Sequence, residues 1–246
     1  MSTMITNQKD TPKNKTVLLF SGGMDSLIMN HLLQPDILLV CCHGNKYQDI
    51  EFAKIQELTN RRIIPDCIFE TSLQLGKFER DDAMIPCRNL YFILLAAQYG
   101  ETIYLGSVYG DRSLDKSSEF FLKSKEMLDY LYLEQHWCVE RKFQVAAPFK
   151  EYTKTELVRE YLSKGGKAEY LLISYSCYEG HIKPCGWCKP CFRKWVALQN
   201  NGILTNAYFL NNPRQAPWLP ELLPLIQQGI YRGREDNEIL LALDMK

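Results

Sequence analysis

The chain has 246 residues, of which 46% are apolar and 24% are charged, and this predicts one large α/β domain or one domain with a small appendage. Its 29 basic residues balance its 29 acidic ones, and a net charge of zero argues against an extended nucleic-acid-binding surface. No apolar run approaches the roughly 18 residues that span a bilayer, so we expect no membrane segment.

The nine cysteines do not have the pattern of a disulfide scaffold, because their number is odd and they are unevenly placed along a large chain. The segment from Met1 to Lys15 is polar and charged, and we expect a flexible tail rather than a signal peptide. These features predict a cytoplasmic protein.

The stretch from Thr16 to Leu33 is expected to be a strand, a glycine turn and a helix that together form an anion site. The turn reads Ser21-Gly22-Gly23-Met24-Asp25-Ser26. Its glycines let the backbone approach a ligand, and the amides of the first helical turn point at negative charge. The serines add hydroxyl donors, and Asp25 can hold Mg²⁺ or cap the turn. A tight turn without a ligand is the alternative, and a Walker loop is excluded by its missing motif.

Strands and helices then alternate along the chain. The continuous apolar run Ile37–His43 is typical of a parallel strand covered on both faces. We expect a helix over Ile50–Asn60 and a short strand over Cys67–Thr71. This order predicts an α/β fold with a doubly wound, mostly parallel sheet, whose ligand site lies at the carboxyl ends of the strands.

A charged loop and a helix entrance follow the third strand. The charges of Leu73–Met84 predict either a solvated surface loop or a lid over a nucleotide. Ile85–Asn89 leads into an apolar helix over Leu90–Tyr99, where Arg88 can bind an anion and Asn89 can be the N-cap. A cap beside an ordinary surface arginine is the alternative.

Two more strands are predicted over Thr102–Val108 and Gln144–Pro148, and the first of them ends in a glycine-bearing turn that reaches Asp111. An amphipathic helix is expected over Ser117–Tyr132. Its apolar side chains are expected in the core: Phe120, Phe121, Leu128 and Leu131.

The last helix before the cysteine cluster is expected over Thr153–Leu162, with a capping box formed by Thr153 and Glu156. Lys154 lies in the first turn of this helix. A cation is unfavourable there against the helix dipole, unless an anion shares the site.

Four cysteines lie within fifteen residues: Cys177, Cys185, Cys188 and Cys191. Two overlapping Cys-x-x-Cys steps and a fourth thiol just upstream predict a structural Zn²⁺ site without an open position. An Fe–S cluster and a redox pair are the alternatives. The other five cysteines are expected to be small buried residues, with Cys87 as the exposed exception.

Taken together, these motifs resemble the 7-cyano-7-deazaguanine synthase (QueC-like) family of ATP-pyrophosphatases, from about Thr16 to Trp195. The loop Ser21–Ser26 is similar to the superfamily's pyrophosphate loop. The other matching positions are Ile85–Asn89 with Phe92 (Val-Pro-Gly-Arg-Asn in the family), Gly106 with Asp111, Pro148 with Lys154 and Glu156, and the four clustered cysteines.

The resemblance implies an adenine-nucleotide α-hydrolase (HUP-like) domain over residues 16–170. A small zinc element with four cysteine ligands over 171–200 and an extension over 201–246 would follow it, and the tail over 1–15 would precede it.

The family's reaction turns a carboxylate on a deazaguanine base into a nitrile. ATP adenylates the carboxylate, ammonia displaces AMP to give an amide, and a second adenylation allows loss of water. The resemblance therefore implies ATP, Mg²⁺ and Zn²⁺ as cofactors, a deazaguanine substrate, ammonia or another amine, and a homodimer. Nucleic acid is not expected as a direct substrate.

The resemblance also implies roles for individual residues. The nucleotide site would use Phe20, Ser21, Gly22, Gly23, Met24, Asp25, Ser26, His43 and Gly106. The catalytic residues would be Ser21, Asp25, Ser26, Arg88 and Lys154, and the substrate residues Arg88, Asn89 and Asp111.

Three departures from the family pattern concern the segments around the substrate. Cys87 stands where the family has glycine, His43–Tyr47 differs from its Tyr-Gly-Gln-x-His, and Arg112–Ser117 is shorter than its base-contacting stretch. An alternative is therefore a divergent enzyme of a defence or nucleic-acid-modification system, which stops at the amide or joins the deazaguanine to another amine or a protein.

Two further alternatives are a tRNA thiolase, which the zero net charge disfavours, and a nucleotide sensor without turnover. Residues 201–246 have no match in the family, and a partner-contacting or subunit-contacting arm is one interpretation.

Overall fold

The computed structural model describes residues 14–45, 47–81, 84–205 and 207–245, so most of the predicted tail lies outside it. Its centre is a five-stranded sheet in the order β3-β2-β1-β4-β5, and every neighbouring pair is parallel. The strands are β1 (Thr16–Leu19), β2 (Ile37–Cys41), β3 (Cys67–Glu70), β4 (Thr102–Tyr104) and β5 (Gln144–Ala146). The predicted α/β fold with a doubly wound parallel sheet is confirmed.

The strand order reverses at β1, because β2 and β3 lie on one side of it and β4 and β5 on the other. Val17 pairs with Ile37 of β2 and with Ile103 of β4. In doubly wound sheets such a reversal opens a crevice at the carboxyl ends of the strands, where ligands bind. The Ser21–Ser26 loop follows β1 directly and therefore lies at this crevice.

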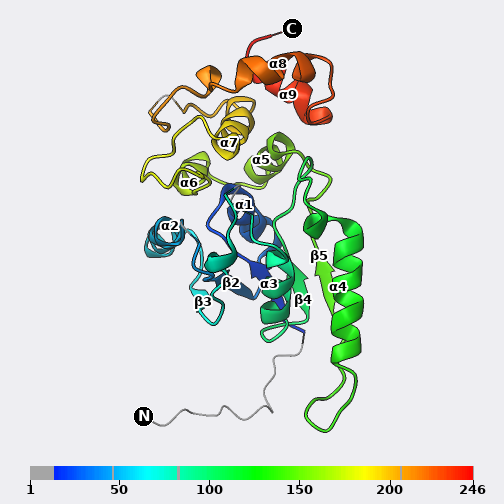
Figure 1. The fold of residues 1–246 in the computed structure, drawn as a ribbon. Coiled ribbons are helices and arrows are strands. Elements are labelled where there is room, and N and C mark those ends of the chain that lie inside the picture. The colour runs from blue at the N-terminus through cyan, green and yellow to red at the C-terminus, as the bar shows by residue number, and fades with distance from the viewer. Residues whose placement is uncertain (1–13, 46, 82–83, 206, 246) are drawn as a thin grey trace.

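Helices cover both faces of the sheet (Figure 1). They are α1 (Met24–Leu33), α2 (Gln48–Asn60), α3 (Arg88–Ala96), α4 (Ser118–Leu131), α5 (Lys154–Ser163), α6 (Ala168–Ile173), α7 (Lys189–Gln199), α8 (Leu219–Gln227) and α9 (Arg234–Ala242). No helix within the described residues combines the length and the apolar run that crossing a bilayer requires.

Side chains of β1 alternate between the two faces of the sheet, and this explains why both faces are covered by helices. Leu18 packs in a cluster with Met29 of α1 and Leu157 of α5, whereas Val17 packs in a second cluster with Ile93 of α3 and Leu128 of α4. All six side chains are fully buried. Successive residues of a strand point to opposite faces, so an apolar run such as β1 requires an apolar layer on each side.

The C-terminal extension packs on the same chain. A third apolar cluster joins Phe192 and Trp195 of α7 to Leu219 of α8 and Ile239 of α9. The Phe192 ring meets the Trp218 ring edge-on, with the centroids 4.9 Å apart. The extension therefore forms a layer over α7 (Figure 1), and a contact with a partner stays a prediction.

The entrance to α3 differs from the expected one. Cys87 is the N-cap residue, in a left-handed conformation with φ 59°, and no side chain caps the helix. Asn89 lies inside the first turn, and its Nδ2 donates to the carbonyl oxygen of Asp115 at 3.2 Å. The prediction that Asn89 is the N-cap is therefore wrong. Glycine suits a left-handed position best, which gives a physical reason for the family's glycine at this place.

Two predictions about helices have opposite outcomes. The capping box of α5 is confirmed, since Thr153 Oγ1 accepts from Glu156 N while Glu156 Oε2 accepts from Thr153 N. In α4, Phe121 and Leu128 are buried as expected, but Leu131 is 44% exposed. Leu131 is the last residue of α4, where the helix faces solvent.

Candidate active site

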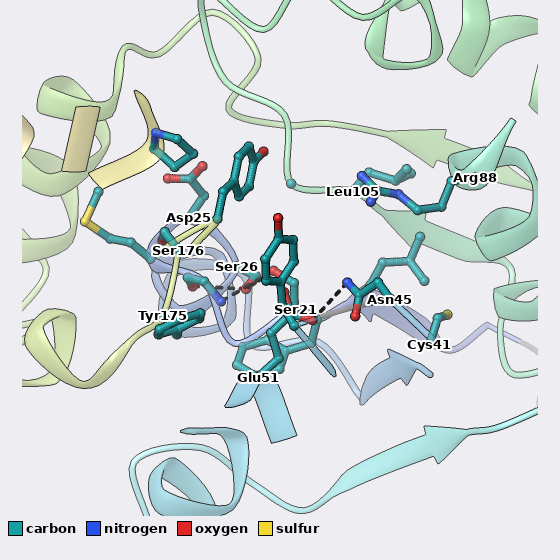
Figure 2. Close-up of a pocket in the computed structure, with 18 of the residues that line it drawn as sticks. Ser21, Asp25, Ser26, Cys41, Asn45, Glu51, Arg88, Leu105, Tyr175 and Ser176 are labelled. Carbon is teal, nitrogen blue, oxygen red and sulfur yellow. Dashed lines mark hydrogen bonds between the residues drawn. The ribbon is translucent and has the colours of Figure 1, made fainter. Parts of the chain in front are cut away.

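A cavity of about 470 Å³ opens where β1, β2 and β4 end. Figure 2 shows that its walls come from segments far apart in the sequence, with Ser21 and Asp25 near one end and Arg88 near the other. The residues predicted from the sequence that line it are Phe20, Ser21, Gly23, Met24, Asp25, Ser26, His43, Arg88, Asn89, Gly106, Asp111 and Lys154. Gly22 is not among the lining residues.

The loop between β1 and α1 has the geometry of an anion site. Gly23 is the N-cap residue of α1, and no side chain caps the helix, so its first-turn amides are not used by a capping side chain. The Ser21 and Ser26 hydroxyl oxygens lie 3.3 Å apart, and Ser26 Oγ also donates to Gly23 O at 3.1 Å. Two hydroxyls and the start of a helix therefore face the same part of the cavity.

The two glycines of this loop have different structural reasons. Gly22 has φ +69°, and a Cβ added there would lie 2.8 Å from Ile55 Cγ1. Gly23 has an ordinary φ of −73°, and the nearest atom to an added Cβ is Ser21 Oγ at 3.2 Å. Gly22 thus shapes the turn, whereas Gly23 leaves room in the cavity.

This difference predicts different effects for two matched substitutions. Gly22→Ala is expected to lower the free energy of unfolding by about 2–3 kcal/mol, because it adds a left-handed alanine and crowds the buried Ile55. Gly23→Ala is expected to cost less than about 1 kcal/mol in stability but to weaken nucleotide binding. Urea unfolding and ATP titration measure the two effects, and equal stability losses would contradict the assignment.

Charged side chains gather beside the loop. Lys154 Nζ, at the start of α5, forms an ion pair with Asp25 Oδ2, while Asp25 Oδ1 is buried without a hydrogen-bond partner among the described residues. An anion therefore does share the site of Lys154, as its place in the helix predicts. The unpartnered Oδ1 of Asp25 can bind a further cation, so Asp25 fits the role of a Mg²⁺ ligand.

Asp111 lies in the same charged group, in the turn after β4. Lys116 Nζ contacts its Oδ2 at 2.8 Å, and Arg193 Nη1 contacts its Oδ1 at 3.1 Å. Burial alone would raise the pKa of Asp111, but the charges of Lys116, Lys154 and Arg193 outweigh it and hold the pKa well below its ordinary value. Asp111 is therefore a carboxylate at neutral pH.

The opposite wall carries hydrogen-bond acceptors. His43 Nδ1 lies 2.9 Å from Cys41 O, so it carries the proton, and Nε2 is a buried acceptor without a partner among the described residues. Burial lowers the pKa of His43, which keeps the ring neutral. Asn45 Nδ2 donates to Glu51 Oε2 at 3.5 Å (Figure 2), and burial raises the pKa of Glu51.

The predicted lid segment reaches this wall. Gly76 N donates to His43 O at 2.6 Å, and a Cβ at Gly76 would lie 1.8 Å from Gly44 O. Glu79 and Met84 line the cavity. Residues 82 and 83 lie outside the described residues. The described part of the loop is anchored to the end of β2 at Gly76, and its role as a lid stays a prediction.

The four clustered cysteines converge on one point. The Sγ atoms of Cys177, Cys185, Cys188 and Cys191 all lie within 4.8 Å of one another. Cys177 Sγ accepts hydrogen bonds from the backbone amides of Glu179 and Cys185, each at 3.4 Å. The pKa of Cys188 is raised to about 12, first by its hydrogen bond to Cys177. Hydrogen bonds from Cys188 and Cys191 hold the pKa of Cys177 well below its ordinary value. A metal ion binds thiolates in place of the remaining protons, so the cluster can hold one.

The segment 174–178 joins the cysteine cluster to the Ser21–Ser26 loop, called the phosphate loop below after its predicted role. Tyr175 N donates to Gly22 O at 3.0 Å, and Ser176 and Tyr178 line the cavity on either side of Cys177. The buried Lys194 of α7 holds this segment, because its Nζ donates to Ser174 O at 2.6 Å and to Tyr208 OH at 2.6 Å. A metal ion in the cluster would therefore stabilise one wall of the cavity.

Sequence reasoning missed several lining residues: Asn45, Tyr47, Glu51, Tyr175, Ser176, Arg193 and Arg232. Ser176 immediately precedes Cys177, a predicted metal ligand, and this position could have indicated that Ser176 lies near the site. Arg193 lies two residues after Cys191, where no local pattern indicated a place in the cavity. Arg232 lies in the unmatched extension, where no local pattern indicated a role.

Comparisons with known proteins agree with this geometry. The family model described as "Queuosine biosynthesis protein QueC" matches residues 46–202, which is more than half of the chain. Similar curated proteins include the 7-cyano-7-deazaguanine synthase of Hahella chejuensis, which is 27% identical over 229 residues, or 79% of this chain and 94% of that protein.

Two archaeal proteins with the same name are similar as well. That of Archaeoglobus fulgidus is 27% identical over 221 residues, covering 77% of this chain and 87% of its own length. That of Methanobrevibacter smithii is 29% identical over 214 residues, covering 75% of this chain and 93% of its own length. Given a match over more than half of its length, together with the parallel sheet and the cysteine cluster, this chain belongs to the QueC family of queuosine biosynthesis proteins.

Proposed function

We propose that this protein is an ATP-dependent ligase that adenylates the carboxylate of a 7-carboxy-7-deazaguanine substrate, amidates it with ammonia and converts the amide to the nitrile. Each adenylation releases pyrophosphate, and AMP leaves in the step that follows it. The relatives named 7-cyano-7-deazaguanine synthase support this proposal. The observation that carries it is one cavity in which an uncapped helix start, two serine hydroxyls and the cations Lys154 and Arg88 come together.

The chemistry needs these groups because a carboxylate is a poor electrophile. Its oxygen attacks the α-phosphorus of ATP, the bond to the β-phosphate oxygen breaks, and the acyl adenylate then has AMP as its leaving group. In our proposal the amides after Gly22 and the hydroxyls of Ser21 and Ser26 bind the departing pyrophosphate. Lys154 and Arg88 offset the charge of the two reacting anions, so that catalysis consists mainly of positioning and electrostatic stabilisation.

Two metal ions are part of the proposal. Asp25 would hold Mg²⁺ through its unpartnered Oδ1, and the ion would neutralise phosphate charge. Cys177, Cys185, Cys188 and Cys191 would hold Zn²⁺ in a closed structural site. The other proposed roles follow the family pattern: Phe20, Met24, His43 and Gly106 at the nucleotide, and Asn89 and Asp111 at the deazaguanine.

The test is turnover by the purified protein. With ATP, Mg²⁺, 7-carboxy-7-deazaguanine and ammonium, we expect AMP and pyrophosphate release that depends on the deazaguanine, and a nitrile product by mass spectrometry. AMP release without a nitrile, but with an amide or a conjugate of an added amine or protein, would favour the divergent enzyme instead. No AMP release with any acceptor would contradict both and leave a nucleotide sensor.

One observation favours the divergent enzyme as the second candidate. Cys87, where the family has glycine, is exposed at the entrance to α3, directly before Arg88. In the segment after Asp111 that also departs from the family, Leu114 is 85% exposed. Both departures flank the proposed substrate end of the cavity. The homodimer implied by the family is a separate prediction, which sedimentation analysis tests.

A further inference from the structure

The C-terminal extension delivers buried charges to the edge of the cavity. Glu235 and Asp236, in the first turn of α9, are 5% and 0% exposed. Arg232, just before α9, lines the cavity although it lies beyond the family match at 46–202. Buried carboxylates are retained in proteins when they are paired, so both residues need partners.

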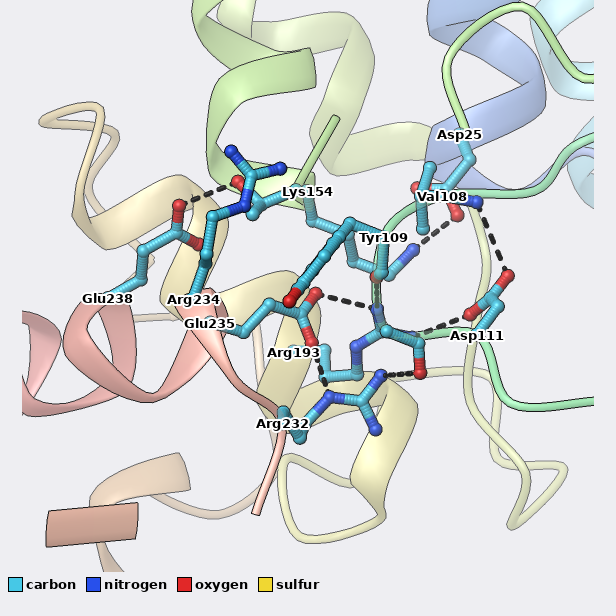
Figure 3. A network of polar contacts seen from close by, with 12 residues as sticks. Asp25, Val108, Tyr109, Asp111, Lys154, Arg193, Arg232, Arg234, Glu235 and Glu238 are labelled. Carbon is cyan, nitrogen blue, oxygen red and sulfur yellow. Dashed lines mark hydrogen bonds and ion pairs between the residues drawn. The ribbon is translucent and has the colours of Figure 1, made fainter. Parts of the chain in front are cut away.

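Asp236 accepts from the Arg232 amide inside the extension, whereas Glu235 pairs with Arg193 of α7, which also pairs with Asp111. Arg193 of α7 bridges two carboxylates: Nη1 lies 3.1 Å from Asp111 Oδ1, and Nη2 lies 2.7 Å from Glu235 Oε1. Its Nη2 also donates to Tyr109 O at 3.0 Å. Figure 3 shows the guanidinium of Arg193 between the two carboxylates. One buried cation thus links the extension to Asp111.

A second arginine, Arg232, joins Glu235 to the turn that carries Asp111. Arg232 Nε pairs with Glu235 Oε2, and Arg232 Nη2 donates to Gly110 O at 2.6 Å. The two backbones fit closely, because a Cβ on Gly110 would lie 2.6 Å from Glu235 Oε2 and a Cβ on Gly233 would lie 2.6 Å from Tyr109 OH. Residues 109–111 are therefore held from both sides by side chains of the extension and α7.

The extension also reaches the helix that carries Lys154. Thr153 Oγ1, in the N-cap residue of α5, donates to Glu238 Oε1 of α9 at 2.6 Å. The turn that carries Asp111 and the start of α5 that carries Lys154 are therefore both held by contacts with residues 232–238. Buried, charge-assisted hydrogen bonds with several donors fix the orientation of the groups they join as well as attracting them.

We propose that the C-terminal extension helps to form the acceptor-binding side of this cavity. Glu235 is a positioning residue that acts through Arg193 to orient the Asp111 carboxylate toward the acceptor substrate. This inference rests on the proposed function, in which Asp111 binds the deazaguanine. Loss of the Glu235 charge should therefore weaken binding of the acceptor and leave binding of the nucleotide unchanged.

Two variants and one control test it in the full-length protein. Glu235→Gln keeps the shape but not the charge, and Arg193→Lys keeps the charge but cannot bridge two carboxylates. Asp244→Asn is the control, because it removes an exposed carboxylate of the same extension that pairs with Arg214 at 2.8 Å, and asparagine tolerates its φ of 59°.

Hydrogen exchange of the peptide containing residues 106–111 is the first readout. We expect roughly tenfold faster exchange in Glu235→Gln and Arg193→Lys, and no change in Asp244→Asn. The second readout is kinetic: KM for the deazaguanine should rise roughly tenfold while KM for ATP changes less than about twofold. Unchanged exchange, or equal changes in both KM values, would overturn the inference.

The outcomes separate this inference from the proposed function. A parent enzyme that releases AMP while both variants behave like it overturns the inference alone. A parent enzyme without turnover overturns the proposed function, and hydrogen exchange then decides whether the extension holds the Asp111 turn. If Glu235→Gln does not fold, Arg193→Lys provides the same comparison.

Discussion

Replacing Lys154 by glutamine is expected to lower kcat by roughly 10²- to 10³-fold, the usual cost of removing one preorganised donor from developing negative charge. Lys154 Nζ is paired with Asp25 Oδ2 beside the phosphate loop, and its side chain is 15% exposed. Glutamine can still donate a hydrogen bond to Asp25, so the fold should persist. The loss is therefore expected in turnover, measured as AMP release at saturating ATP, and not in the melting temperature.

The matched control for this prediction is on the same helix. Lys164, the C-cap residue of α5, has a 64% exposed side chain and faces Glu160 at 3.9 Å. Lys164→Gln removes the same charge far from the cavity and should leave kcat unchanged. If Lys154→Gln retains parent-like kcat, or if both variants lose activity equally, Lys154 does not stabilise the reacting phosphates.

The second large effect is expected from the cysteine cluster. Cys191→Ser should lower metal content from about one ion per chain to near zero, since the cluster has four ligands and no spare one. Structural zinc contributes about 10–16 kcal/mol in small zinc peptides. Even a loss of about 4 kcal/mol lowers the melting temperature of a domain of this size by roughly 8–16 °C. Elemental analysis and thermal unfolding measure the two effects.

Cys138→Ser is the control for this substitution, because Cys138 lies outside the cluster in the loop after α4. It should keep both the metal and the melting temperature. Elemental analysis also separates the alternatives: zinc supports the structural site, iron with visible absorbance supports an Fe–S cluster, and a metal-free, redox-titratable pair supports a thiol couple. A metal-free protein with unchanged stability in Cys191→Ser would contradict a structural metal site.

Loss of the metal should also disturb the phosphate loop and so weaken nucleotide binding. The segment from Ser174 to Tyr178 is bonded to Gly22 through the Tyr175 amide and contains the proposed metal ligand Cys177. We therefore expect a weaker affinity for ATP in the metal-free protein at temperatures where it is still folded. Titration with ATP before and after chelation measures this coupling.

The parts of the fold that the sequence predicts well are those determined by neighbouring residues. The capping box needs only Thr153 and Glu156, and the apolar run of β1 already requires two covered faces. The cysteine spacing likewise brings thiols together through one tight turn. Asn89 shows the limit of local reasoning, because a left-handed Cys87 moved the helix start and placed Asn89 inside the first turn.

The composition of the cavity depended on contacts that no local pattern contains. Lys154 and Asp25 are 129 residues apart in sequence, Arg193 and Asp111 are 82 apart, and Arg232 and Gly110 are 122 apart. Each pair forms only because separate helices pack against the same ends of the parallel strands. The extension could not be assigned from its residues for the same reason, since its polar partners come from the turn after β4 and from α5 and α7.

The sequence by itself thus determined the α/β order, the glycine turn after β1 and the clustering of the four cysteines, because backbone propensity and short spacing are properties of adjacent residues. The tertiary structure alone decided which charges face the loop and that α9 supports Asp111. A buried ion pair is stable only when both partners leave water together, and this requires the packed surfaces of the whole chain.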